Sequence, residues 1–568
     1  MPHSPFNSPG RLYGLLTLII LLMSFFVGPA KSLAQTRPPG VPDIGAATRE
    51  ALEARPTPTP RREDPGLGEE TPTKIPESTG GATMLVREFR LEDIPYLKEA
   101  EVQEVLQPFT NKELTYAKIE EAINRVSELY REKGYPAVKV YLPPQDGTDG
   151  IIVLKALVGS YGSNSLQNNS LVTDWLVKGF IDANFPKGRP VKRQDLERMV
   201  LLIGDLPGAA LPKLSMGAGS APGTTDFFVE VPKGERFKGF FSSDNMGSYY
   251  TGRWRFMTGV DVLSPFNLGD KLSVFGLTTE TQELNSLAFN YELPLNASGL
   301  RLNLGYSAVY YRLGQDYEDL EFTGRSKILE ATLSYPIIRA ANQNLYLSFN
   351  LAYKSMEERY GVFDFEQKDH ATVGKFGLTY ERWSTLFGKP LYTRFGGKLT
   401  YGNFRAADEN EDTDGAFAYA NLEFMASLAL AEKWTLSLAA SGQKAIDRPL
   451  DSVEQFSVTG ANGVKAYRES ISGDNGYVVN GEIRYRLPSI GVVDHYIGAF
   501  GDYGYWRREK RISGLLNSDS LADVGLSYYL NLPHFSLKTQ LVHAVGPYPE
   551  EVRKDSETYL SVMAVVSF

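Results

Sequence analysis

The amino-acid sequence predicts a membrane β-barrel of sixteen antiparallel strands, preceded by two small α/β domains. Three observations support this fold class. From Gly234 to the last residue, apolar and polar residues alternate in one segment after another, which is the pattern of strands with two different faces. Each segment is about as long as a strand that crosses a bilayer at a tilt. Before Gly234, residues 84–233 show helical and strand patterns in two successive blocks.

The composition excludes several classes of function. The 568 residues include no cysteine, which rules out disulfide bonds, thiol nucleophiles and cysteine-ligated metals. Acidic residues outnumber basic ones by 68 to 59, and the net charge of −9 argues against binding to nucleic acid, which needs a basic surface. Five histidines offer little for a metal site, and no zinc-protease, serine-hydrolase or phosphate-loop motif occurs. We therefore expect neither an enzyme nor a cofactor.

Residues 1–34 are predicted to be a secretory signal peptide. Arg11 precedes the apolar run 15–27, and the Ser-Leu-Ala segment 32–34 offers small residues before a cleavage point. The alternative is a membrane-anchoring helix. Pro29 and the small residues of segment 32–34 before the cleavage point favour a signal peptide over such a helix. We therefore expect an exported mature chain without a helical membrane span.

Residues 35–83 are rich in proline and are predicted to form a semi-extended linker, because such a composition cannot bury a core. Within the linker, residues 43–55 have helical character. Asp43 can cap the first turn, and Arg49 and Glu53 lie one turn apart. About twelve residues alone in water make only a marginal helix. Either this segment frays, or another part of the protein holds it.

Residues 84–159 are predicted to form the first small α/β domain. Residues 85–91 alternate as a strand, and residues 115–133 carry apolar side chains at helical spacing. Two further strands are expected at 137–142 and 151–158, joined by a turn that contains proline and glycine. The order is therefore strand, helices, strand and strand.

Residues 160–233 repeat this order and are predicted to form a second domain of the same kind. Helical patterns cover 171–183 and 192–203, and strand patterns cover 211–217 and 226–231. Two tandem copies of one small unit describe this region better than one large domain does. Neither copy contains a catalytic motif.

The region 234–568 contains sixteen predicted strands, and an even number is typical of bacterial outer-membrane barrels. The strands are expected near 236–246, 250–261, 269–279, 282–294, 299–312, 325–337, 344–356, 369–384, 391–405, 415–430, 433–446, 475–487, 494–506, 519–531, 533–545 and 556–568. A soluble sandwich would also alternate. However, an open sheet of this size would expose its edges, whereas a closed barrel has none.

Aromatic residues near strand ends predict the interfacial girdles of a barrel in a lipid bilayer. They are Tyr249, Tyr250, Trp254, Tyr310, Tyr311, Trp434, Tyr503, Tyr505 and Trp506. The chain ends on Phe568, with apolar residues at every second position before it. This terminal strand resembles the signal by which bacterial outer-membrane barrels are inserted. We therefore expect outer-membrane lipid and the barrel-assembly machinery among the partners.

One connection, residues 447–474, is much longer than most of the others. It contains the sequence Val464-Lys465-Ala466-Tyr467. The strand after the next one contains Phe500-Gly501-Asp502, and alternation places the first and third of these side chains on the lumen side. An empty barrel of sixteen strands would be a water-filled pore, so an inserted loop has a physical purpose.

At these residues the chain resembles the transporters of bacterial two-partner secretion, the exporters of haemolysin and filamentous-haemagglutinin type. Members of that family carry two polypeptide-transport-associated (POTRA) domains before a sixteen-stranded barrel. They also carry an N-terminal plug helix joined by a proline-rich linker, which residues 43–55 resemble. The resemblance therefore implies a plug formed by Asp43, Ile44, Ala47, Ala51 and Leu52.

In that family the sixth extracellular loop enters the lumen with the motif V-R-G-[YF], and its arginine pairs with the aspartate of F-x-D on a barrel strand. Here Val464 to Tyr467 match the first motif and Phe500 to Asp502 match the second. Lys465 replaces the arginine, so the pair loses its bidentate geometry. Ala466 replaces the glycine, so a positive φ at this position would be strained.

The resemblance implies a pore in the bacterial outer membrane that exports a large partner protein, with residues 35–233 mostly in the periplasm. The partner is expected to be a β-helical adhesin or a haemolysin-like protein, recognised in the periplasm and translocated unfolded without nucleotide hydrolysis. The alternatives are a barrel-assembly insertase of the same superfamily and a passive diffusion porin. Two POTRA-like domains and the 43–55 segment favour secretion over both, and an outer-membrane lipase or protease would need a recognisable catalytic triad.

Overall fold

The computed structural model describes residues 43–54, 65, 83–145, 149–407, 412–511, 516–546 and 556–568. The signal peptide expected at 1–34 and most of the proline-rich linker lie outside these residues. The chain forms two compact units. One contains residues 1–62, 235–338 and 342–568, and the other contains residues 63–234 and 339–341. Within the described ranges, no helix is both long and apolar enough to cross a membrane.

The first α/β block begins with two short strands where the sequence predicted one. Its elements are β1 (Thr83–Val86), β2 (Glu88–Leu91), α3 (Glu99–Leu106), the 3-10 turn η1 (Gln107–Phe109), β3 (Lys112–Thr115), α4 (Tyr116–Glu132), β4 (Val138–Tyr141) and β5 (Ile151–Val158). The strand expected over 85–91 is interrupted at Arg87, whose N–H donates to the carbonyl oxygen of Gly150 at 2.7 Å. Because of this break, β1 pairs with β3 and β2 pairs with β5, in different sheets.

Helix α4 supplies the core of this block. Thr115 caps its N-terminus by accepting a hydrogen bond from the backbone N–H of Lys118. Ile119, Val126 and Tyr130 are buried, as expected for side chains that share one face of a helix. These side chains pack in one cluster with the inner faces of the strands.

The second α/β block repeats the topology of the first. Its elements are β6 (Ser160–Asn168), α5 (Asp174–Asn184), α6 (Arg193–Gly204), β7 (Lys213–Ala218) and β8 (Thr224–Val231). The strand order is β2-β5-β4 in the first block and β6-β8-β7 in the second. In both sheets the first strand runs parallel to the last, and the last strand lies in the centre. The strand β6 was not assigned from the sequence.

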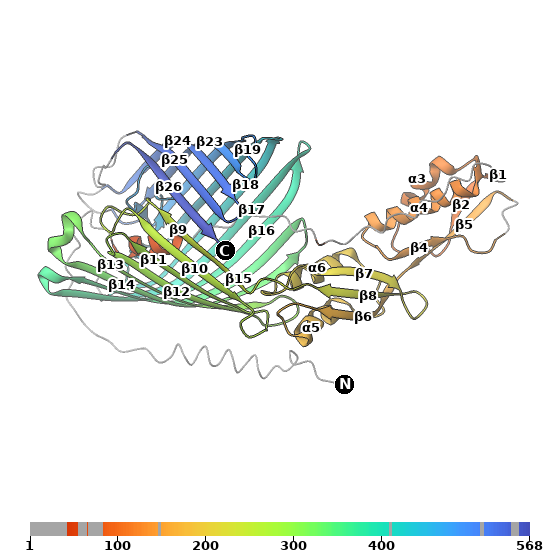
Figure 1. Cartoon of the computed structure of the whole chain (residues 1–568), viewed down its shortest axis with the longest axis horizontal. Coiled ribbons are helices and arrows are strands. Elements are labelled where there is room, and N and C mark those ends of the chain that lie inside the picture. The colour runs from red at the N-terminus through yellow and green to blue at the C-terminus, as the bar shows by residue number, and fades with distance from the viewer. Residues whose placement is uncertain are drawn as a thin grey trace. The chain divides into compact units, whose positions relative to one another are not determined.

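The remaining strands form a closed barrel, and each of the sixteen predicted strand ranges overlaps one observed strand. The strands are β9 (Phe237–Asp244), β10 (Arg255–Leu263), β11 (Lys271–Thr279), β12 (Leu284–Pro294), β13 (Arg301–Arg312), β14 (Phe322–Arg339), β15 (Gln343–Tyr360), β16 (Phe365–Leu386), β17 (Lys389–Arg405), β18 (Gly415–Ala431), β19 (Trp434–Ile446), β22 (Asn475–Arg486), β23 (Asp494–Arg507), β24 (Ser518–Leu532), β25 (Phe535–Val545) and β26 (Thr558–Ser567). The barrel closes where β26 pairs antiparallel with β9 (Figure 1). The predicted fold class is confirmed.

Alternation divides the barrel into an outer and an inner face. On β14, exposed positions such as Arg325, Lys327 and Leu329 alternate with the buried positions Ser326 and Ile328. The outer face of the barrel is largely apolar, as lipid contact requires. The inner face contains many buried polar side chains, and some of them, such as Glu358 and Lys354, contact elements inserted into the lumen.

The predicted aromatic girdle is wrong for three of its members. Trp254, Trp434 and Tyr503 are exposed on the outer surface to at least 41%. In contrast, Tyr250, Tyr311 and Trp506 are at most 8% exposed and belong to the clusters inside the barrel. Position near a strand end does not reveal the face, because neighbouring residues of a strand point in opposite directions.

The terminal residue extends the closing seam beyond β26. The backbone N–H of Phe568 donates to the carbonyl oxygen of Gly239 at 3.0 Å, and the N–H of Gly239 donates to the carbonyl oxygen of Phe568 at 2.9 Å. The phenyl ring lies against Gly239, where an added Cβ would come within 2.4 Å of it. The ring therefore occupies the space above Gly239 of β9, which the side chain of any other residue would fill.

Deletion of Phe568 should reduce the amount of folded barrel, because it removes two hydrogen bonds and the ring contact from the short closing seam. Heat-modifiable mobility of the protein from outer membranes would measure the folded fraction. Phe387→Ala, which changes a 93% exposed phenylalanine in a turn, is the matched control. Normal levels of folded barrel in the deletion variant would show that the terminal residue is dispensable.

Candidate functional site

The segment expected to be helical forms helix α2 (Ile44–Glu53), which lies inside the barrel (Figure 1). Asp43 caps the helix, since its Oδ1 accepts a hydrogen bond from the N–H of Ala46 at 2.7 Å. Ile44, Ala47 and Ala51 are buried in one cluster with lumen-facing residues of the barrel wall, whereas Leu52 is only half-buried. The barrel therefore holds a helix that is too short to be stable alone.

Polar contacts fix the position of α2. The backbone N–H of Ile44 donates to Glu358 Oε1 at 2.9 Å, and the hydroxyl of Tyr311 donates to the same oxygen at 2.9 Å. A Cβ at Gly45 would lie 2.4 Å from the carbonyl group of Ser452, which belongs to the long connection 447–474. The helix backbone therefore touches this connection directly, and glycine allows the close approach.

The connection 447–474, which we name the lumen loop, packs into the barrel. It contains the 3-10 turn η4 (Ser452–Glu454) and two short strands that pair with each other, β20 (Phe456–Ser457) and β21 (Ser472–Gly473). Glu454 is buried and is held by Lys354 of β15 and by the hydroxyl of Tyr419 of β18, the latter at 2.6 Å. At the end of the loop, Asp474 accepts hydrogen bonds from the N–H groups of Leu450 and Glu509, both at 2.7 Å.

The structure brings Lys465 and Asp502 together. Lys465 Nζ lies 2.6 Å from Asp502 Oδ2, and the two side chains are 13% and 1% exposed. The ammonium also lies 5.0 Å from the centre of the Phe500 ring, within the range of a cation–π contact. Asn480 of β22 donates to Asp502 Oδ1 at 2.7 Å and to the carbonyl oxygen of Gly463 at 3.1 Å. A lysine at this position thus forms a buried ion pair with several partners.

The other residues of the two sequence motifs have distinct environments. Val464 and Tyr467 are completely buried in the cluster that fills this side of the lumen. Ala466 is not among the residues with positive φ, so the strain expected for an alanine in place of glycine does not arise. Phe500 is buried on the lumen side, whereas Gly501 is half-buried at the alternate position of β23.

Two residues that hold the loop were not identified from the sequence. Asp523 of β24 lies directly opposite Asp502 in the strand register, and its Oδ2 accepts a hydrogen bond from the N–H of Ala466 at 2.7 Å. Tyr559 of β26 donates through its hydroxyl to the carbonyl oxygen of Lys465 at 2.6 Å. The alternating pattern of its strand could have predicted that Asp523 points into the lumen. The pairing register of the strands was needed to show that it faces Asp502.

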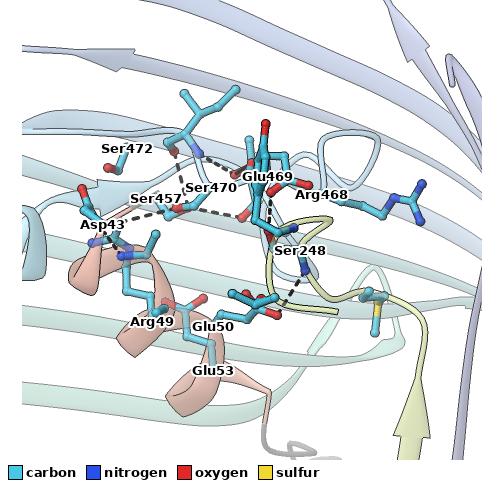
Figure 2. A pocket seen from close by; sticks show the side chains of 18 of the residues that line it. Asp43, Arg49, Glu50, Glu53, Ser248, Ser457, Arg468, Glu469, Ser470 and Ser472 are labelled. Atoms are coloured by element: carbon cyan, nitrogen blue, oxygen red, sulfur yellow. Dashed lines mark hydrogen bonds between the residues drawn. The ribbon is translucent and has the colours of Figure 1, made fainter. Parts of the chain in front are cut away.

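Helix α2 and the lumen loop meet across a cavity of about 230 Å³ (Figure 2). Arg49 of the helix donates to the carbonyl oxygen of Ser452 and, at 3.4 Å, to the hydroxyl of Ser470. Glu469 of the loop accepts from the hydroxyl of Ser248 at 2.5 Å and from Arg253 at 3.0 Å. The N–H of Ser248 also donates to Glu50 Oε1 of the helix at 3.3 Å. Helix, loop and barrel wall therefore form one connected polar network.

Glu50 is a carboxyl group of this network whose pKa is shifted by its surroundings. Burial raises the pKa of Glu50 to about 7, and the nearby carboxylates of Glu469 and Asp244 act in the same direction. Arg255 lies 3.7 Å from Glu50, but its guanidinium already binds Asp244 through two hydrogen bonds. Within the described residues, no group of three or more His, Asp or Glu side chains could hold a metal ion.

Raising the pH should weaken the docking of α2. The docked Glu50 has a pKa of about 7 against an ordinary value of 4.5, so docking is favoured below pH 4.5 and is progressively lost as the pH rises towards 7. The open probability in planar bilayers should rise by about tenfold or more between pH 5 and pH 8, since each pKa unit corresponds to about 1.4 kcal/mol. Glu50→Gln should flatten this dependence, whereas Glu128→Gln on α4 should not. An unaltered pH dependence in Glu50→Gln would contradict this assignment.

Comparison with known proteins gives concordant matches. The family model "Haemolysin secretion/activation protein ShlB/FhaC/HecB" matches residues 223–527, and the model "POTRA domain, ShlB-type" matches residues 84–159. The heme/hemopexin transporter protein HuxB of Haemophilus influenzae is 26% identical over 441 residues, covering 75% of this chain and 77% of the relative. The outer membrane transporter CdiB of Dickeya dadantii is 21% identical over 478 residues, covering 77% and 79%.

A solved structure of CdiB from Escherichia coli has the same fold, with a TM-score of 0.69 and 18% identity over the full length of both chains. The match to the family model covers more than half of the chain and includes most of the barrel. The protein is an outer-membrane transporter with periplasmic POTRA domains and a closed barrel. The chain therefore belongs to the ShlB/FhaC/HecB family of haemolysin secretion/activation proteins, the transporters of two-partner secretion.

Proposed function

We propose that α2 and the lumen loop close the pore at rest, and that the transporter exports one large partner protein, unfolded, when both elements move. The partner is proposed to be a β-helical adhesin or a haemolysin-like protein. The observation that carries the proposal is the polar network around Arg49, Glu50 and Glu469, which joins the helix, the loop and the barrel wall. These polar contacts can be exchanged for contacts with water at a small net cost.

Recognition of the partner is proposed to occur at the two α/β blocks. The order β6-β8-β7 leaves β7 at an edge of its sheet, and the order β2-β5-β4 leaves β4 at an edge. An unfolded segment can add to such an edge as a further strand, with backbone hydrogen bonds that do not depend on its sequence. The exposed apolar side chains of Tyr141 and Phe228 lie on these two sheets and would give such an interaction some specificity.

Transport is proposed to proceed without nucleotide hydrolysis or any cofactor. Folding of the partner at the cell surface would make each translocated segment unable to return, which supplies direction. The alternatives of an insertase and a diffusion porin receive less support, because the family model that matches the barrel is that of secretion proteins. The family members are transporters, which agrees with the absence of enzyme motifs in the sequence.

Lys465→Ala should reduce export of the partner more than Asp502→Ala does. Without Lys465, Asp502 loses its ion-pair partner and faces Asp523, and Lys538 is the cation that remains nearby, whereas without Asp502 the side chain of Lys465 still faces Asp523. Because an unpaired buried charge costs several kcal/mol, we expect a loss of about tenfold or more for Lys465→Ala. The double variant should lose less than the sum of the single variants, because removing the second charge relieves the first.

The measurement is the amount of partner protein in the medium, divided by the amount of heat-modifiable barrel in the outer membrane. Lys465→Arg should be tolerated, since a guanidinium can pair with the same carboxylate. Lys433→Ala, an exposed lysine in the short turn between β18 and β19, is the matched control. Wild-type export by both single alanine variants would show that the ion pair does not hold a functional gate.

Deletion of residues 36–60 should raise the single-channel conductance in planar bilayers while secretion remains possible. The deletion removes α2 and leaves its place in the lumen to water. Gly45→Val should also raise the conductance, because a side chain at this position would collide with Ser452 of the lumen loop and prevent docking of α2. Gly179→Val in α5, where an added Cβ meets nothing within 4 Å, is the matched control. Unchanged conductance in both lumen variants would exclude the plug function of α2.

A further inference from the structure

The outer surface of the barrel carries a groove with a volume of about 540 Å³ across strands β9 to β14. Its floor is formed by small outward residues, including Gly276 of β11 and Ala308 of β13. Phe241 and Leu287 form apolar walls and are exposed to 49% and 45%. Such a groove on the lipid-facing side of a barrel can accommodate an acyl chain.

One end of the groove is basic. Arg325 and Lys327 line it from successive outward positions of β14 and lie directly opposite Tyr310 and Ala308 of β13. Arg312 is the next outward residue of β13 after Tyr310. Two positions along a strand are about 7 Å apart and neighbouring strands are about 5 Å apart, so these three cations lie close together.

These basic side chains are available to a ligand. Arg325, Lys327 and Arg312 are exposed, and no described carboxylate forms an ion pair with any of them. The guanidinium of Arg325 lies 5.7 Å from the centre of the Tyr310 ring, a cation–π contact that limits its orientations. Preorganised arginine beside lysine is a typical arrangement for binding phosphate.

The cations lie at the outer boundary of the membrane. β9 follows the periplasmic domains, so β13 runs outward and β14 returns, which places the β13–β14 connection at the extracellular end. From Leu329 to Ile337, every outward position of β14 is occupied by an apolar or aromatic residue. At a strand tilt of about 40°, the stretch from Ile337 to Lys327 is about 33 Å of strand and about 25 Å of height, which is the height of the apolar band. Lys327 and Arg325 follow directly at headgroup level.

We propose that this groove binds a phosphorylated glycolipid of the outer leaflet, namely the lipid A part of lipopolysaccharide. Arg325, Lys327 and Arg312 would bind the phosphate groups, and an acyl chain would lie over Gly276 and along the side chain of Leu287, which separates Gly276 from Ala308 in the strand register. Charge complementarity at headgroup level and an adjacent apolar channel select this occupant. The site is on the opposite face of the barrel wall from the gate, so the inference does not depend on the proposed mechanism of export.

The test uses the full-length protein, purified in detergent and titrated with bisphosphoryl lipid A under native mass spectrometry. Arg325→Gln/Lys327→Gln should weaken binding by about thirtyfold, because each basic side chain near an anionic lipid contributes roughly fivefold in affinity. Arg359→Gln/Arg405→Gln removes the same charge from exposed positions that do not line the groove, and it should change binding by less than about twofold. An equal loss in both double variants would overturn the proposal, because it would indicate attraction to surface charge alone.

The groove itself is tested by Gly276→Leu, which leaves all cations in place. An added Cβ at Gly276 has no neighbour closer than 3.8 Å, so the side chain should fill the groove without disturbing the strand. Binding of lipid A should fall by about tenfold, a smaller change than that of the charge variant. Unchanged binding in Gly276→Leu, or displacement of lipid A by inorganic phosphate, would overturn the assignment. Heat-modifiable mobility confirms that each variant is folded.

Discussion

Closure of the sheet is the constraint on which the rest of this structure depends. Pairing of β26 with β9 leaves no free strand edge, so the backbone of every strand is satisfied within the membrane. The same closure creates a lumen lined by alternate side chains of every strand. A lumen of this width would fill with water unless other parts of the chain occupied it. Helix α2 and the lumen loop occupy it, and they come from segments that are far apart in the sequence.

Buried ion pairs, together with apolar clusters, hold these elements in the lumen. Lys354 and Glu454 anchor the beginning of the lumen loop, and Lys465 and Asp502 anchor its tip. Buried ion pairs contribute little net stability, because desolvation offsets their attraction, but losing one partner is costly. Such ion pairs therefore determine where the loop lies in the lumen more than they add to the stability of the fold. When water enters the lumen, it can solvate the separated charges, which is compatible with the proposed movement of the helix and the loop.

The outer face of the same strands has a different chemistry. Arg325 and Lys327 alternate with the buried Ser326 and Ile328, so one strand presents basic side chains outward while its inner face packs against the filled lumen. An outward cation at headgroup level needs no partner within the protein, because solvent and lipid phosphates are available to it. An inward cation such as Lys465 has a carboxylate within 2.6 Å. A cation on the inner face of the barrel thus needs a carboxylate of the same chain, whereas a cation on the outer face can be neutralised by solvent or lipid.

Properties that depend on local order could be predicted from the amino-acid sequence. Alternation with a period of two identified the strands of the barrel, and the spacing of apolar residues identified α4 and the helical segment that forms α2. The positions of Lys465 and Asp502 in two motifs of the family predicted that these two residues pair. The folded chain was needed to show that Asp523 faces Asp502, that Tyr311 and Trp506 point inward, and that residues 85–91 form two strands of different sheets. These features depend on register, on the face of each strand and on pairing between distant segments, and a local pattern contains no information about which distant residue becomes a neighbour.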